Sequence, residues 1–227
     1  MSDSSAKIWD LLNDLEDLVR GGYRLNHPAF IAGDTLVPSA ADEKLKKAVA
    51  TCGKCELNRG RTHTVPGTGV LDPLVLVIGE GPGAEEDRAG LPFVGPAGKY
   101  LDKWLGAVDL SREKNCYIAN IVKCRPPGNR DPRPEETAAC IPYLETQIEY
   151  LLPKAILTVG RIAAQILLKT PRGIGSMHGQ VFEYHGIPLV PTYHPSGVLR
   201  NPEYRRAVWD DLKILRNLIA REMNDVY

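Results

Sequence analysis

The chain of 227 residues lacks the features that would place it in a membrane or outside the cell. It has no apolar run that approaches the length of a membrane span, and its acidic, amphipathic beginning does not resemble a signal peptide. It also lacks an excess of charge of either sign, since its formal net charge is zero. Bulk electrostatics therefore indicate no nucleic-acid partner, and any basic patch must be local. We expect a cytoplasmic location.

Nucleotide-binding motifs are missing as well. Residues 79–83 read GEGPG, but the third glycine is misplaced for G-x-G-x-x-G and a proline intervenes. Four acidic side chains between residues 80 and 87 would also repel a pyrophosphate. The Gly98-Lys99 pair lacks the upstream glycine and the following hydroxyl residue of a P-loop.

Cysteine is scarce, and its number, five, is odd. In a cytosolic chain this favours metal binding over a disulfide framework. Cys52 and Cys55 form a C-x2-C unit, while Cys124 and Cys140 form a second pair 15 residues apart. Four thiolates suit either zinc or an iron–sulfur cluster, and the spacing fits paired zinc knuckles poorly. We interpret Cys116 as a small buried hydrophobic residue.

The chain is organised around an apolar run at residues 74–78, which is typical of a buried parallel strand. It stops at the GEGPG segment, whose glycines let the backbone turn sharply. Because ligands bind at the carboxyl ends of strands in open α/β sheets, we predict the active site here.

Helical and strand patterns alternate along the rest of the chain, which predicts a parallel sheet with helices on both faces. The expected strands are residues 117–122, 155–159 and 188–193, and the expected helices are residues 134–152, 161–168 and 204–222, with a β-hairpin at residues 173–186.

Residues 1–45 are expected to form a helical extension and linker. Residues 7–20 have helical spacing, residues 21–39 are rich in glycine and proline, and a helical pattern resumes at residues 40–49. The extension either docks a partner, such as a repair or replication protein, or is an amphipathic helix packed on the domain or a mobile tail.

Two polar residues are expected beside the strand ends. Asn120 lies within a strand, where a buried amide must be paired, so it is either a structural bridge or a reader of a ligand's amide edge. His194 follows the last strand and is the histidine that we predict to be catalytic. The loop at residues 123–133 is rich in arginine and is either a solvated loop or a local basic patch.

These motifs together resemble the family-4 uracil-DNA glycosylases, the iron–sulfur class found in bacteria and archaea. The matching pieces cover residues 48–217 and occur in the family's order: C-x2-C at 52–55, GEGPG at 79–83, GLPFVGPAG at 90–98, NIVKCRPPGNR at 120–130, Cys140, and HPS at 194–196. Residues 1–45 lie outside the resemblance.

The resemblance implies a three-layer αβα sandwich with a central four-stranded parallel sheet, formed by residues 46–227. It implies a monomeric DNA-repair hydrolase that removes uracil from DNA and leaves an abasic site. It also implies a structural [4Fe–4S] cluster held by the four thiolates, Cys52, Cys55, Cys124 and Cys140.

For the chemistry, uracil must leave the base stack and enter a pocket. There Phe93 would stack on the ring, and Asn120 would accept from N3–H and donate to O4. His194, with backbone N–H groups near Gly81, would stabilise the leaving uracil anion. Glu80 would orient water or offset the charge on the sugar, and Glu86 would line the pocket and share this role.

On the DNA side, Val198 and Leu199 would wedge into the duplex or simply pack under the last helix. Arg200 would contact a phosphate, and Arg125 and Arg130 of the basic loop would contact the DNA backbone. Two rival functions stay open: a relative that traps the sugar covalently, and a non-enzymatic iron–sulfur DNA-binding module. The first needs a histidine between Asn120 and Cys140, which this chain lacks.

Overall fold

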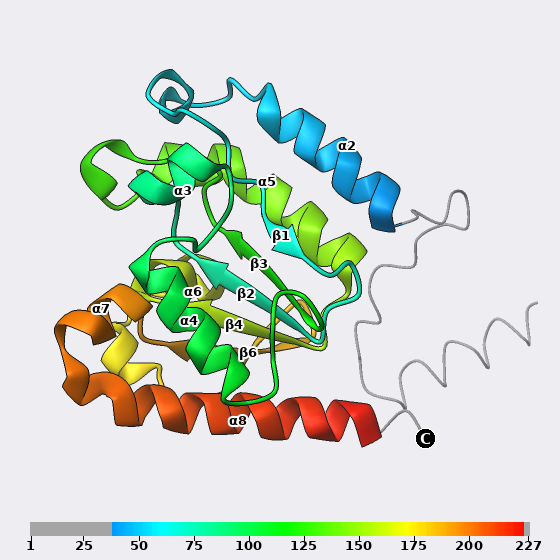
Figure 1. Ribbon diagram of the computed structural model, residues 1–227, viewed down its shortest axis with the longest axis vertical. Coiled ribbons are helices and arrows are strands. Elements are labelled where there is room, and N and C mark those ends of the chain that lie inside the picture. The colour runs from blue at the N-terminus through cyan, green and yellow to red at the C-terminus, as the bar shows by residue number, and fades with distance from the viewer. Residues whose placement is uncertain (1–37, 225–227) are drawn as a thin grey trace, which may run out of the picture. The chain divides into compact units, whose positions relative to one another are not determined.

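The computed structural model describes residues 38–224, which form a six-stranded sheet with helices on both faces (Figure 1). The strands are β1 (Thr68–Gly69), β2 (Val75–Gly79), β3 (Cys116–Asn120), β4 (Ala155–Val159), β5 (Phe182–Tyr184) and β6 (Ile187–Thr192). The helices are α2 (Pro38–Ala50), α3 (Ala84–Ala89), α4 (Pro96–Gly106), α5 (Pro134–Leu151), α6 (Arg161–Leu168), α7 (Pro195–Arg200) and α8 (Arg205–Asn224).

The strand order is β1-β3-β2-β4-β6-β5. The four central strands, β3, β2, β4 and β6, are parallel, and this confirms the expected four-stranded core. The short strands β1 and β5 pair antiparallel at the two edges. Parallel central strands place their carboxyl ends at the same edge of the sheet, which is where a ligand site forms in this architecture.

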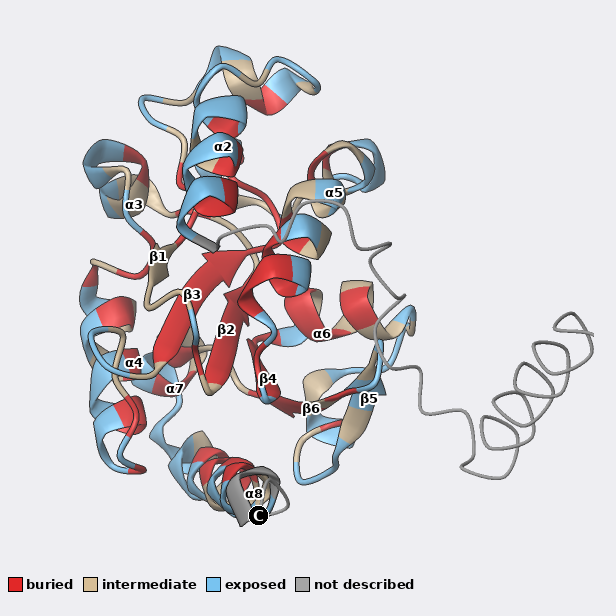
Figure 2. Ribbon diagram, turned by 90° about the vertical axis from the view of Figure 1, so that its right-hand side faces the viewer, coloured by how far each residue is buried: buried red, intermediate tan, exposed pale blue. Residues whose placement is uncertain are grey.

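The sheet has a hydrophobic core on each face, so the domain has three layers. In β2, Leu76 and Ile78 pack with α2, α5 and α6, whereas Val75 and Val77 pack with α4 and α8. This alternation follows from the two-residue period of a strand. Figure 2 shows the central strands buried throughout, while the helices are buried only on the sides that face them.

The expected hairpin at residues 173–186 is wrong. Residues Ile174–Ser176 form a short 3-10 helix, and the hairpin instead joins β5 to β6. Its turn is formed by His185 and Gly186, which both have positive φ angles, 51° and 80°. Two consecutive positive φ values are the conformation of a tight type I′ turn, and this sets the strand register.

Helix α2 packs on the domain as an integral element. Its residues Ala41, Leu45 and Val49 are buried in the same core as α5, and this confirms the helix expected at residues 40–49. The boundary expected between residues 45 and 46 falls inside this helix. Residues 1–37 lie outside the described part, so the helix expected at residues 7–20 and the linker after it stay predictions.

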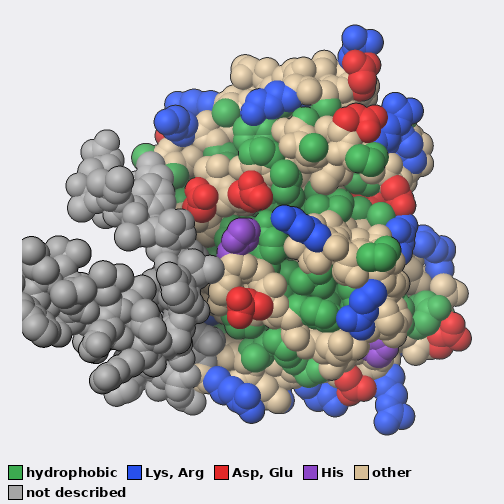
Figure 3. All heavy atoms as spheres, turned by 180° about the vertical axis from the view of Figure 1, so that it is seen from behind, with side chains coloured by type: hydrophobic (Ala, Val, Ile, Leu, Met, Phe, Trp, Pro, Cys, Tyr) green, Lys and Arg blue, Asp and Glu red, His purple; other side chains and the backbone are tan. Residues whose placement is uncertain are grey.

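The surface carries mixed charge. On the face shown in Figure 3, Lys and Arg side chains are interspersed with Asp and Glu side chains, in keeping with the zero net charge. Among the helices of residues 38–224, none is both long enough and apolar enough to span a bilayer.

Candidate functional site

A cavity of about 490 Å³ lies at the carboxyl ends of β2, β3 and β6. Its lining includes six residues predicted from the sequence to bind substrate or act on it, namely Glu80, Gly81, Glu86, Phe93, Asn120 and His194. Arg130 and Arg200 also line it, whereas Arg125, Leu199 and the four cysteines lie outside this lining.

Asn120 ends β3 with its amide facing the cavity. The side chain is only 1% exposed, and its oxygen Oδ1 has no hydrogen-bond partner among the described residues. An unpaired buried polar atom costs about 1–3 kcal/mol. Gly79 leaves the space that the amide occupies, because a Cβ there would lie 2.4 Å from Oδ1 and 2.6 Å from the Phe93 ring. The oxygen is therefore poised to accept a hydrogen bond from a ligand.

Phe93 forms one wall of the cavity and is held by its backbone. It adopts a left-handed φ of 52°, which is uncommon for a bulky residue. Arg112, which the sequence reading missed, donates to the carbonyls of Pro92 and Phe93 at 3.0 Å each and pairs with Asp102 at 2.7 Å. A Cβ at Gly98 would collide with the Phe93 carbonyl. These contacts place the aromatic ring 5.9 Å from that of His194.

His194 caps the N-terminus of α7 at the end of β6. The backbone N–H of Ser196 donates to its Nδ1 at 3.2 Å, and the Ser196 hydroxyl lies 2.8 Å from the same nitrogen. Because a backbone N–H can only donate, Nδ1 is the acceptor, and the network assigns the ring proton to Nε2. Burial, aided by the charge of Arg200, lowers the pKa of His194 to about 4. The imidazole is therefore neutral and offers one N–H donor.

Glu80 follows β2 directly and is partly buried. Burial raises the pKa of its carboxyl to about 7, the negative charge of Asp131 adds to this, and Arg161 opposes it. Asp131 and Arg161 form an ion pair at 2.6 Å that joins the basic loop to the start of α6. A carboxylate with this pKa is suited to accept a proton near neutral pH.

Glu86 binds the protein's own backbone. Its carboxylate accepts hydrogen bonds from the N–H groups of Gly83, Val94 and Gly95, at distances of 2.9 to 3.1 Å. These bonds tie the GEGPG turn to the segment that carries Phe93. Glu86 also lines the cavity, so the substrate-binding role expected from the sequence stays a prediction.

The residues expected to contact DNA lie in α7 and in the basic loop. Leu199 is 44% exposed, and Arg200 is exposed at the margin of the cavity, whereas Val198 is completely buried. Arg130 is engaged by Glu136 through two hydrogen bonds of 2.8 and 2.6 Å, which hold the basic loop on α5. Arg125 donates to Asn129 at 2.8 Å within the same loop.

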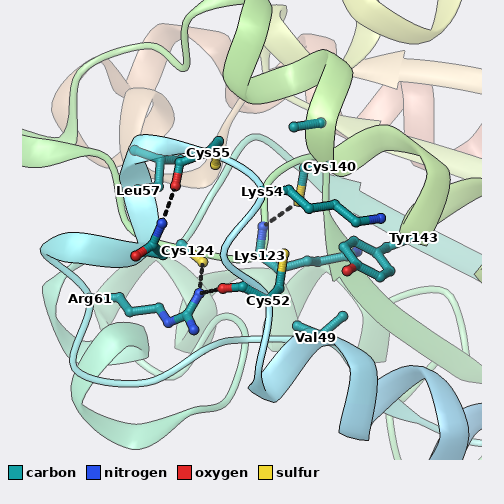
Figure 4. A pocket seen from close by; sticks show the side chains of 12 residues that line it. Val49, Cys52, Lys54, Cys55, Leu57, Arg61, Lys123, Cys124, Cys140 and Tyr143 are labelled. Atoms are coloured by element: carbon teal, nitrogen blue, oxygen red, sulfur yellow. Dashed lines mark hydrogen bonds between the residues drawn. The ribbon is translucent and has the colours of Figure 1, made fainter.

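The four expected ligand cysteines line one small pocket of about 10 Å³, on the same side of the sheet as α2 and α5 (Figure 4). Cys52 and Cys55 are partly exposed, while Cys124 and Cys140 are buried. Arg61 donates to the Cys124 sulfur at 3.3 Å and to the Cys52 carbonyl at 2.8 Å. Burial raises the pKa of the Cys140 thiol to about 11 and also raises that of Cys124.

Lys123 belongs to the loop that the sequence predicts to be either solvated or a local basic patch, but its side chain is buried and lines the cysteine pocket. The Lys123 side chain donates to the carbonyl of Asn120 at 2.8 Å and to Gln147 Oε1 at 2.6 Å. Burial lowers the pKa of its amine to about 8. A lysine is rarely buried unless its ammonium N–H groups have acceptors. The local sequence does not predict that the Asn120 carbonyl and Gln147 would provide them.

Residues 66–213 match the family model for the uracil DNA glycosylase superfamily. The chain belongs to this superfamily. The matched segment contains every residue of the cavity together with Cys124 and Cys140, whereas Cys52, Cys55 and α2 precede it.

Curated relatives of the superfamily named type-4 uracil-DNA glycosylase are similar over most of the chain. The Thermotoga maritima protein is 41% identical over 184 residues, which are 79% of this chain and 95% of the relative. The Sulfurisphaera tokodaii protein is 39% identical over 184 residues, 78% of this chain and 84% of the relative. The Archaeoglobus fulgidus protein is 36% identical over 193 residues, 82% and 96% of the two chains.

Proposed function

We propose that this protein excises uracil from DNA by hydrolysing the N-glycosidic bond of a flipped nucleotide, which leaves an abasic site. The observation that carries the proposal is the unpaired, buried Oδ1 of Asn120, placed in a cavity beside an aromatic wall and a neutral histidine. Uracil offers an N3–H donor to this oxygen and an O4 acceptor to the adjacent amide N–H.

Base choice follows from this one amide. Cytosine presents an acceptor at N3 and an amino donor at C4, the reverse of uracil, so both amide atoms would meet like partners in a buried site. A site built for one hydrogen-bonding pattern rejects an analogue that lacks it by up to about 10⁴–10⁵. Phe93 would stack on the base, and its ring lies within reach because Gly79 carries no side chain.

The leaving group is stabilised by His194. When the bond from C1′ to N1 breaks, its electron pair leaves with uracil, and negative charge develops on O2. The Nε2–H of the neutral imidazole donates to O2, and backbone N–H groups at the GEGPG turn near Gly81 also stabilise the negative charge on the leaving uracil. Since the pKa of His194 is about 4, the ring need not lose a proton to reach this form at neutral pH.

Glu80 is the general base that accepts a proton from the attacking water. The sugar carries positive charge after bond cleavage, and water adds to C1′ while one of its protons passes to the Glu80 carboxylate. The raised pKa, about 7, gives a carboxylate that is a stronger base than an exposed glutamate. Before that transfer, its negative charge also offsets the charge of the sugar.

DNA binding is proposed for the cavity margin. Leu199 is exposed next to Arg200, which lines the cavity, and would fill the space that the flipped base vacates, while Val198 is buried. Arg200 and Arg125 would contact phosphates. Arg130 contributes mainly by holding the basic loop in place through Glu136.

The cysteine pocket is proposed to hold a [4Fe–4S] cluster through Cys52, Cys55, Cys124 and Cys140. The spacing C-x2-C…C-x15-C fits paired zinc knuckles poorly, and the four thiols line one pocket. Four thiols spread around a pocket suit a polynuclear group better. The cluster would fix the basic loop against α5, and the raised thiol pKa values mean that iron binding must displace protons.

Other expectations concern the whole protein. A monomeric state, a cytoplasmic location and recruitment of a repair or replication protein through residues 1–45 stay predictions. Deletion of residues 1–37, which leaves α2 intact, tests the last of these by comparing partner capture and uracil release with those of the full chain.

The test of function is release of free uracil from a uracil-containing oligonucleotide by the wild type and by His194→Ala. His185→Ala, in the exposed turn of the β5–β6 hairpin, is the matched control. We expect multiple turnover by the wild type and the control, and a rate at least about 100-fold lower for His194→Ala. Tight binding or a covalent adduct without released base would support one of the two rival functions instead.

A further inference from the structure

Lys123 is a buried charged residue for which the excision chemistry has no role. Its side chain is 1% exposed, and it lies behind the cavity wall rather than in it. Burying an ammonium group is unfavourable unless its donors are satisfied. A methionine of similar length would fill the same space without that cost, so its contacts are the place to look for a function.

The side chain of Lys123 reaches the backbone of the base-reading residue. Its Nζ donates to the Asn120 carbonyl at 2.8 Å and to Gln147 Oε1 at 2.6 Å. The pairing of β1 with β3 stops at Ile118, two residues before Asn120, so the edge strand does not extend to this carbonyl. The lysine takes the place of a strand partner at the end of β3.

The backbone of Lys123 is fixed at the same time. Its N–H donates to the Cys140 sulfur at 3.3 Å, and its carbonyl accepts from the N–H of Val65 at 2.7 Å. Gln147 is held in turn, because its amide donates to the Pro66 carbonyl at 2.9 Å. One residue therefore joins the end of β3, helix α5 and the loop before β1.

The Asn120 amide depends on this support. Its Oδ1 has no hydrogen bond among the described residues, so only packing and the placement of its backbone orient the side chain before a base arrives. A displacement of about 1 Å at a reacting or binding group can reduce a rate by about 100-fold.

We propose that Lys123 is a positioning residue for base recognition: it holds the Asn120 carbonyl and so sets the amide against the uracil edge. The residue does not touch the substrate. It also connects the base-reading strand end to the cysteine-bearing helix, so a disturbance at Cys140 would be felt at Asn120. The inference rests on the proposed function and deepens it.

The experiment compares Lys123→Met with the wild type and with Lys154→Met, an exposed lysine just before β4. Single-turnover uracil release and inhibition by free uracil are measured well below each melting temperature, together with iron and sulfide content. We expect Lys123→Met to release uracil about 10- to 100-fold more slowly and to lose inhibition by free uracil in proportion, with unchanged iron content and unchanged affinity for uracil-free DNA. Lys154→Met should match the wild type.

A double-mutant cycle with Asn120→Ala separates positioning from general stability. If Lys123 acts through the Asn120 amide, Lys123→Met adds little to the loss already caused by Asn120→Ala. Additive losses, or a single variant with wild-type rate and inhibition, would overturn the proposal. If Lys123→Met does not fold, Lys123→Gln, which is polar but too short to span both acceptors, is judged by the same criteria. Failure of the wild type to release uracil would instead reject the proposed function.

Discussion

The pH dependence of uracil release should report the ionisation of Glu80. Burial is the main cause that raises its pKa to about 7, and the nearby charge of Asp131 adds to it. A base must be ionised to accept a proton from water. With this pKa, about nine-tenths of the carboxyl groups are ionised at pH 8 and about one-tenth at pH 6, so the single-turnover rate should fall about 10-fold between them.

Two substitutions move this profile in defined ways. Glu80→Gln removes the ionisable group, so the low remaining rate should lose its dependence on pH between 6 and 8. Asp131→Asn removes a negative neighbour and frees Arg161, whose charge favours the carboxylate. Both effects lower the pKa of Glu80, so the acid limb of the profile should shift to lower pH.

The assay is single-turnover release from a uracil-containing oligonucleotide between pH 5 and 9. Asp72→Asn, an exposed carboxyl just before β2, is the matched control. Titration of His194 does not contribute to the profile between pH 5 and 9, since its pKa is about 4. An acid limb that persists in Glu80→Gln, or that moves to higher pH in Asp131→Asn, would refute the assignment of Glu80 as the base.

The same pKa makes a prediction for stability. A carboxyl whose pKa is raised in the folded state binds its proton more tightly there than in the unfolded chain. The Glu80 carboxyl therefore lowers the free energy of unfolding by an amount that grows as the pH rises from about 4.5 to 7 and stays constant above pH 7. Glu80→Gln should raise the melting temperature at pH 8 and leave it unchanged at pH 4, as measured by thermal unfolding.

Three further predictions concern other parts of the site. Leu199→Ala should slow uracil release from double-stranded DNA about 10-fold more than release from single-stranded DNA. Only in a duplex does the flipped base leave a gap in the base stack that the Leu199 side chain would fill. Gly79→Ala should reduce release by at least about 100-fold, because its methyl group would collide with the base-reading amide and the aromatic ring. Arg61→Gln should speed the loss of iron–sulfur absorbance in air, because it removes a donor to the sulfur of Cys124, a proposed cluster ligand.

Each of these variants has a control elsewhere in the chain. Leu152→Ala removes another exposed leucine, Gly106→Ala adds a methyl group that meets nothing within 4 Å, and Arg59→Gln removes an exposed arginine that pairs with Glu56. Equal effects of Leu199→Ala on both DNA forms, full activity of Gly79→Ala, or an unchanged bleaching rate in Arg61→Gln would contradict the respective interpretation.

Local sequence determined the elements and the place of the site. The apolar run before Gly79 specifies a buried strand, and the glycines after it end that strand. The alternation of strands and helices then fixes a parallel sheet, whose carboxyl ends bring Asn120 and His194 to one cavity. These features depend on side-chain period and turn residues over a few positions, and the sequence displays such information directly.

The residues 173–186 show where local information is insufficient. Glycine-rich stretches suit several turn types, and the strand register of β5 depends on the His185-Gly186 turn and on pairing with β6. Strand pairing at an edge is decided by contacts with a partner strand rather than by propensity.

The tertiary structure alone decided what each polar group does. Sequence alone does not show that backbone N–H groups donate to Glu86 or that Arg130 pairs with Glu136, because these partners meet only in the folded chain. The fold likewise buries Lys123, and it leaves the Asn120 oxygen without a partner among the described residues, which favours a ligand contact over a structural bridge. Hydrogen bonds and pKa shifts depend on which atoms meet after folding, because burial removes the water that would otherwise satisfy every polar group alike.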